Sequence, residues 1–116
     1  MASRILTWYY RGVDPEMPAY YLERDYTPAH IRVYAKKEPS GGDLQVDIKD
    51  DGTSILASYA FLPKGDNLEE DAEDFLDTES IMEVGSVVTC DVVVTNGADG
   101  ITVQLELLSL NDEEGD

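Results

Sequence analysis

The chain has 116 residues, of which 25 are acidic and 8 are basic, so its formal net charge is −17. That length suits one domain with a modest core, and a hydrophobic content of 42% argues against global disorder. The acidic balance argues against nucleic-acid partners and against adsorption to anionic membranes. A single cysteine excludes an intrachain disulfide. With no long apolar run and no secretory signal, we expect synthesis in the cytoplasm and no membrane span.

Residues 1–29 predict an N-terminal aromatic arm. Residues 4–11 are rich in β-branched and aromatic side chains, which favours a strand, and residues 19–23 predict a second, short strand. The aromatic rings either cap the open end of a β core or form a contact surface, since Tyr and Trp are enriched at interfaces. The candidate partner-binding residues are Trp8, Tyr9, Tyr10, Tyr20, Tyr21 and Tyr26.

Residues 41–56 predict a β-hairpin, and a strand over residues 30–37 precedes it. Leu44, Val46 and Ile48 alternate with polar residues, as in a strand with one buried face. Two aspartates and a glycine then break the alternation with strong turn chemistry. We expect this local hairpin to form early and to offer the other strands an edge for pairing.

Residues 66–79 form an acidic segment that contains eight acidic residues. Leu68, Ala72, Phe75 and Leu76 have the spacing of one short amphipathic helix. The alternative is a solvated loop in which Phe75 or Leu76 packs back on the core. In both cases the acidic side chains should face solvent, because burying many like charges is prohibitive.

The C-terminal part predicts two strands, over residues 86–95 and 101–107, joined by a hairpin loop over residues 96–100 with Asn-Gly turn chemistry. Residues 111–116 form an acidic tail. The whole pattern predicts an all-β fold, an antiparallel β-sandwich or jelly roll of about seven to eight strands with at most one short helix. Residues 30–110 are its expected core.

The sequence shows no pattern typical of catalysis, and we expect a non-enzymatic protein. His30 and Cys90 are the only histidine and cysteine, and we interpret them as a strand-end polar residue and a buried, inert thiol. Asp47, Asp50 and Asp51 lack the ligand spacing of a calcium loop and are better explained by turn chemistry. The sequence therefore predicts no catalytic residue, no cofactor and no metal site, although weak Ca²⁺ or Mg²⁺ binding by the acidic patches stays open.

Three short motifs follow one another in the first half of the chain, and a Gly-linked strand pair over residues 85–107 follows them. The motifs are Pro39-Ser40-Gly41, Leu44-Gln45-Val46-Asp47-Ile48 and Gly52-Thr53-Ser54-Ile55. In this order they resemble a small β module of tailed-phage virion proteins, which occurs in tail fibres, baseplate-associated proteins and capsid decoration proteins. The resemblance covers residues 30–109, except for the acidic segment. It implies a jelly-roll-like virion component, often trimeric, without catalytic residues.

Three functional hypotheses follow from this resemblance and from the composition. The first is a capsid decoration or cement protein, a homotrimer on the capsid exterior that binds the major capsid protein or other virion proteins. The second is a tail-fibre or baseplate head module that binds host surface glycans by stacking sugars on an exposed Trp8 and the tyrosines. The third is a small enzyme or a metal-dependent binding protein.

Overall fold

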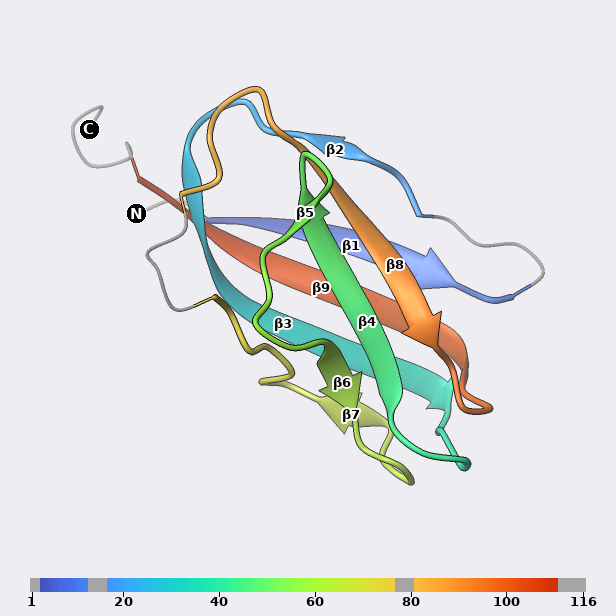
Figure 1. Ribbon diagram of the computed structural model, residues 1–116. Helices are drawn as coiled ribbons and strands as arrows, with labels where there is room; N and C mark the ends of the chain where they lie inside the picture. Colours follow the sequence, from blue (N-terminus) through green and yellow to red (C-terminus); the bar gives the residue numbers. More distant parts are fainter. Residues whose placement is uncertain (1–2, 13–16, 77–80, 111–116) are drawn as a thin grey trace.

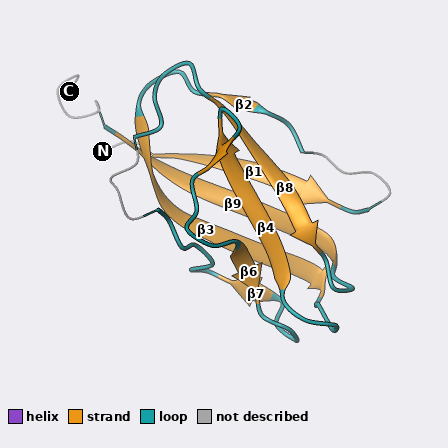
Figure 2. Cartoon of the chain, viewed as in Figure 1, coloured by secondary structure: helices purple, strands orange, loops and turns teal. Residues whose placement is uncertain are grey.

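The computed structural model describes residues 3–12, 17–76 and 81–110 (Figure 1). Two antiparallel sheets pack face to face as a β-sandwich, which confirms the predicted fold class. The described residues form nine strands and no helix (Figure 2), so this part of the chain also contains no helix that could cross a membrane. The strand count is slightly above the expected one because several strands are only two or three residues long.

The first sheet is built around the C-terminal strand. In spatial order it contains β1 (Ser3–Tyr10), β9 (Asp99–Ser109), β3 (Tyr26–Lys37) and β7 (Leu68–Glu69). β9 alternates as predicted, with Ile101, Val103, Leu105 and Leu107 buried between the sheets. Because β1 and β3 both pair antiparallel with β9, they run parallel to each other and end at the same end of the sheet.

The second sheet is built around the predicted hairpin. It contains β2 (Tyr20–Tyr21), β8 (Val87–Val94), β4 (Leu44–Asp50) and β5 (Thr53–Ser54), and β6 (Ala60–Leu62) also pairs with β4. Asp51 and Gly52 join β4 to β5 with φ of 52° and 86°. Positive φ at both central residues is the signature of a tight hairpin turn whose twist matches that of the strands. The hairpin is therefore confirmed.

The three aspartates of this hairpin lie in different environments, and turn chemistry accounts for only one of them. Asp47 is a buried residue inside β4, where its carboxylate accepts a hydrogen bond of 2.6 Å from the Ser54 hydroxyl. Asp50 is the last residue of β4. Asp51 lies in the turn, and its side chain accepts a hydrogen bond of 2.9 Å from the Val87 backbone N–H.

The predicted hairpin between β8 and β9 is wrong in its pairing, although both strands exist. β8 belongs to the second sheet and β9 to the first, so residues 95–98 cross between the sheets. Asn96 and Gly97 make the expected tight bend, with φ of 51° and 90°. The side-chain amide nitrogen of Asn96 donates to the Asp43 carbonyl at 2.6 Å, and the backbone carbonyl of Asn96 accepts from the Gly41 N–H at 3.1 Å. These contacts hold the bend against the β3–β4 connection. The chain therefore passes from the second sheet to the first at this point, and β8 and β9 do not pair with each other.

The core lies between the sheets and draws on nearly every strand. Cys90 is buried in β8, as predicted, and burial raises the pKa of its thiol, an effect that the nearby Asp91 and Asp47 charges increase. The thiol therefore stays protonated and unreactive in the folded protein. The largest fully buried side chains include Leu6, Trp8, Leu22, Ile31, Leu44, Ile48, Leu62, Met82, Ile101, Leu105 and Leu107.

Residues 66–76, which we call the acidic strap, are extended, so of the two alternatives for this segment the helix is wrong over these residues. The strap pairs with β3 through β7, and the Asn67 carbonyl accepts from the Ala35 N–H at 2.8 Å. It then reaches the second sheet, where Leu76 N–H donates to the Ile55 carbonyl at 3.0 Å. Phe75 packs against the core, as the loop alternative expected. Residues 77–79 and the predicted tail over 111–116 lie outside the described residues.

Candidate interaction surface

Two of the six candidate contact residues are core residues. Trp8 and Tyr26 are 0% and 3% exposed. The Trp8 indole N–H donates a hydrogen bond of 2.7 Å to the Pro18 carbonyl, and the ring packs edge-on against Tyr20 at 5.5 Å between centroids. The expectation that an exposed Trp8 could stack on sugars is therefore wrong. The period of two along β1 explains this, because it turns Leu6 and Trp8 inward.

Tyr20 closes the free edge of β1. Its hydroxyl donates to the Thr7 carbonyl at 2.7 Å and accepts from the Thr7 N–H at 3.4 Å. The Arg4 guanidinium lies 5.8 Å from the centre of the Tyr20 ring, within the range of a cation–π contact. An unpaired edge strand is a template for pairing with another chain. The Tyr20 hydroxyl occupies the backbone groups at the middle of that edge, so Trp8 and Tyr20 together support the capping interpretation.

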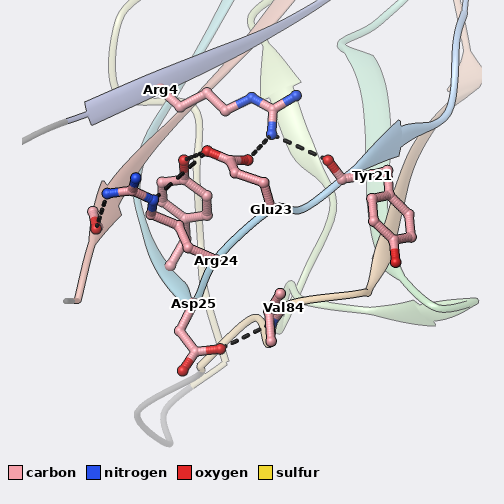
Figure 3. A network of polar contacts seen from close by, with 8 residues as sticks. Arg4, Tyr21, Glu23, Arg24, Asp25 and Val84 are labelled. Carbon is pink, nitrogen blue, oxygen red and sulfur yellow. Dashed lines mark hydrogen bonds and ion pairs between the residues drawn. The ribbon is translucent and has the colours of Figure 1, made fainter. Parts of the chain in front are cut away.

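A network of charged side chains fixes the segment after β2 (Figure 3). Arg4 donates to the Tyr21 carbonyl at 3.1 Å and forms an ion pair with Glu23, which also accepts a hydrogen bond from the Tyr26 hydroxyl. That hydrogen bond, assisted by the charges of Arg4 and Arg24, lowers the pKa of Glu23. Burial, assisted by Glu23, raises the pKa of Tyr26.

The side of the sandwich bounded by β1 and β8 is only partly covered. β2 pairs with β8 at Val87 and Val88 alone, so the rest of that β8 edge lies beyond β2 (Figure 1). Partly buried side chains pack against the core, among them Tyr10, Met17 and Val92. The surface beside β1 is a shallow hollow lined by Thr7, Tyr9, Met17, Pro18 and Tyr20.

A second hollow shares Tyr9 with the first and is basic. The Arg11 guanidinium lies 4.9 Å from the centre of the Tyr9 ring. Lys36 and Lys37 complete the basic lining, so three of the eight basic residues of the chain gather here beside one acid, Asp99. We call the two hollows together the Tyr9 surface; its lining residues are Thr7, Tyr9, Arg11, Met17, Pro18, Tyr20, Lys36, Lys37, Asp99 and Gly100.

The sequence pattern indicated the aromatic half of this surface but not the basic half. The structure gathers Tyr9 and Tyr20, while Tyr21 is 66% exposed on β2 and Tyr10 is half-buried. Arg11 directly follows β1, and two lysines end β3. These side chains meet because β1 and β3 end at the same end of the first sheet. The basic residues could not be grouped from the sequence, because their proximity depends on the order of the strands in the sheet.

A separate polar cluster lies where the acidic strap crosses β3. His30 Nδ1 is 3.3 Å from Asp71 Oδ1 and 3.5 Å from Glu73 Oε2. Among the described residues, this is the one group of three or more His, Cys, Asp or Glu side chains close enough to share a metal ion. No metal site was expected from the sequence, which holds one histidine and one cysteine. The histidine and the two carboxylates belong to segments far apart in the chain, so no local motif brings them together.

Comparison with protein-family models, with curated proteins and with solved structures finds no match to this chain.

Proposed function

We propose that the protein is a non-enzymatic structural component of a tailed-phage virion, and specifically a capsid decoration protein that binds the shell exterior. The ordered motifs around β4 and β5 suggest the virion module, and the β-sandwich agrees with the fold that they imply. The observation that carries the binding role is the Tyr9 surface. It combines an aromatic hollow with a basic one at one end of the first sheet, although the net charge of the chain is −17.

The chemistry of this surface favours an acidic partner segment with an apolar anchor. Tyr9 offers a large ring that loses little entropy when it is covered, and Arg11 and Lys37 can pair with carboxylates. Elsewhere the net negative charge repels an acidic shell, so the attraction is local and sets the orientation of docking.

We also propose a homotrimer, because the virion modules that the motifs resemble are often trimeric. Three copies bring together about three times the charge of one chain, at a cost that salt screens. We therefore expect the acidic strap to point away from the trimer axis. Contacts of the strap with β3 and with residues 55–57 place it on the side of the sandwich opposite β1. Sedimentation equilibrium should give the mass of three chains, and a monomeric mass at micromolar concentration would remove the trimer from the proposal.

Location in the virion is the decisive test. Antibody raised against the protein should label the heads of virions from the source culture, evenly over the shell, in negative-stain images. Labelling confined to tail tips would replace the proposal by the tail-fibre or baseplate alternative. Particles without any label would overturn the virion assignment itself.

Point substitutions test the Tyr9 surface better than deletion of residues 1–26. That deletion would remove β1 and the buried Trp8, and so would disrupt the fold. In a pull-down with shells that lack the protein, Arg11→Glu with Lys37→Glu should weaken binding at least tenfold. Lys49→Glu with Lys64→Glu makes the same change in net charge outside the Tyr9 surface and should bind nearly as the wild type does. Equal losses in both double variants would show that only net charge matters and would contradict this surface.

A further inference from the structure

The cluster at the crossing of β3 and the acidic strap is held by backbone contacts. Ala72 is fully buried, and its N–H donates to the Ile31 carbonyl at 2.9 Å. Residues two apart in an extended segment point to the same side. Asp71 and Glu73 flank the buried Ala72, so both carboxylates lie on the outer side, where His30 also projects from β3.

Glu73 is oriented by a hydrogen bond that leaves one oxygen for a ligand. Its Oε1 accepts from the Ile31 N–H at 2.9 Å and replaces a strand partner there. Its Oε2 then faces His30 Nδ1 at 3.5 Å. The Glu73 side chain is only 17% exposed, so this carboxylate is held before any ion arrives. Little ordering remains to be paid when a ligand binds.

The two distances from His30 Nδ1 to the carboxylate oxygens match the edges of a metal-centred tetrahedron. Zinc lies about 2.0–2.2 Å from nitrogen and carboxylate ligands, so two ligands at a tetrahedral angle are about 3.3–3.6 Å apart. The Nδ1–Oδ1 and Nδ1–Oε2 distances are 3.3 and 3.5 Å. Each of the three residues offers one ligand atom within 4.8 Å of the other two.

We propose that His30 Nδ1, Asp71 Oδ1 and Glu73 Oε2 form a binding site for one divalent transition-metal ion, with Zn²⁺ as the best match. Imidazole nitrogen suits zinc and its neighbours, whereas Ca²⁺ takes six to eight oxygen ligands and Mg²⁺ is bound by oxygen in octahedral geometry. Water completes the coordination, since His30 and Asp71 are exposed. The bound ion ties the strap to β3 and offsets the repulsion between two carboxylates. This site is independent of the proposed virion role.

Titration of the untagged full chain with Zn²⁺ tests the site directly. His30 is the only histidine, so calorimetry should give one Zn²⁺ per chain, and the imidazole NMR signals should shift with the same titration curve. Tm should rise with the Zn²⁺ concentration, because an ion that binds only the folded state stabilises it by mass action. Ca²⁺ at equal concentration should raise Tm much less.

Variants separate this site from general attraction of cations to an acidic surface. His30→Gln and Asp71→Asn should each weaken Zn²⁺ binding at least tenfold. Glu70→Gln removes a neighbouring exposed charge of the strap and should leave the affinity within about twofold, since Glu70 is outside the cluster. Unchanged affinity in His30→Gln, unmoved imidazole signals or equal effects of Ca²⁺ and Zn²⁺ would each overturn the proposal. Trp8 fluorescence verifies that each variant is folded.

Discussion

Trp8 lies between the two sheets with its ring against Tyr20 and its N–H bonded to the Pro18 carbonyl. The hydrogen bond matters because the indole N–H has no access to water, and an unpaired buried donor is costly. One side chain therefore joins β1, the residues before β2 and the core. Loss of the ring should affect the whole N-terminal third of the fold.

Replacing Trp8 gives a graded prediction. Trp8→Ala should lower the free energy of unfolding by about 3–5 kcal/mol, because it leaves a large cavity. Trp8→Phe keeps most of the apolar contact but leaves the Pro18 carbonyl without its hydrogen-bond donor. It should lower the free energy of unfolding by about 1–3 kcal/mol. Urea unfolding followed by circular dichroism measures both values. Tyr34→Phe, at an exposed ring on β3, is the control and should change stability little. A loss below about 1 kcal/mol for Trp8→Ala would contradict the buried position.

Asp50 is a residue whose charge opposes folding. Its Oδ1 is buried and has no hydrogen-bond partner within the described part of the chain. Burial raises the pKa of Asp50, the charges of Asp51 and Glu83 add to the rise, and a hydrogen bond with Ser86 opposes it. A carboxyl whose folded pKa is raised gives its full stability below the unfolded pKa and loses it as the pH rises through the folded pKa.

Asp50→Asn should therefore raise the urea midpoint at pH 7, where the wild type carries the buried charge. The gain should shrink at lower pH, because the raised pKa lets the folded wild type take up its proton at a higher pH than the unfolded chain does. Asp66→Asn removes an exposed charge and is the matched control, with little change at either pH. A gain for Asp50→Asn that stays constant with pH would refute the assignment to charge burial.

At the scale of elements, the strand edges are mostly covered by short segments. β7 covers the edge of β3, β2 covers the beginning of β8, and β5 and β6 cover β4. Two- and three-residue edge strands offer few backbone groups for pairing with another chain. β1 is an edge strand along its whole length, and the Tyr20 hydroxyl occupies its centre. The outer edge of β8 beyond Val88 has no strand partner among the described residues.

The acidic strap protects the backbone of β3, so loosening the strap should speed hydrogen exchange on that strand. The Asn67 amide donates to the Ala35 and Lys36 carbonyls at 2.8 and 3.4 Å. Asn67→Ala should cost about 1 kcal/mol and should speed hydrogen exchange at the Ala35 amide, whose acceptor is the Asn67 carbonyl. Glu70→Ala changes an exposed neighbour and should leave exchange at β3 unchanged. Unaltered exchange in Asn67→Ala would mean that the strap is held elsewhere.

At the scale of the whole molecule, the net charge of −17 acts on a body with extents of 47 × 28 × 24 Å. The Debye length is about 30 Å at 0.01 M salt and about 8 Å at 0.15 M. In dilute salt, charges therefore repel one another across the width of the molecule. At physiological salt only neighbouring charges do so. An expanded chain separates its charges, so this repulsion weakens the folded state.

Salt should therefore stabilise the protein. Raising NaCl from about 0.01 to 0.15 M should move the urea midpoint upward, with less gain beyond, because most screening is then complete. Urea is the suitable denaturant, since guanidinium is itself a screening salt. A midpoint that is flat or falls with NaCl would show that local ion pairs, such as Arg32 with Glu106 at 2.9 Å, outweigh the general repulsion.

Local chemistry explains which features the sequence could predict. Alternation identified the β4 and β9 strands, because side chains on successive strand residues point to opposite faces. It also identified Cys90 as a buried thiol. Turn chemistry located the bends at Asp51-Gly52 and Asn96-Gly97, because positive φ favours these residue types. Each inference depends on residues only a few positions apart.

Contacts between distant segments explain the rest. Only the tertiary structure shows that β8 and β9 belong to different sheets. It also shows the acidic strap extended along β3, because pairing with the backbone groups of an open edge outweighs a weak helical pattern. The same pairing brought Arg11 to Lys37 and His30 to Glu73. The sequence by itself determined the long strands and their tight bends. The tertiary structure decided which strands are neighbours, and with them both candidate sites, since sheet order depends on long-range pairing that no local pattern encodes.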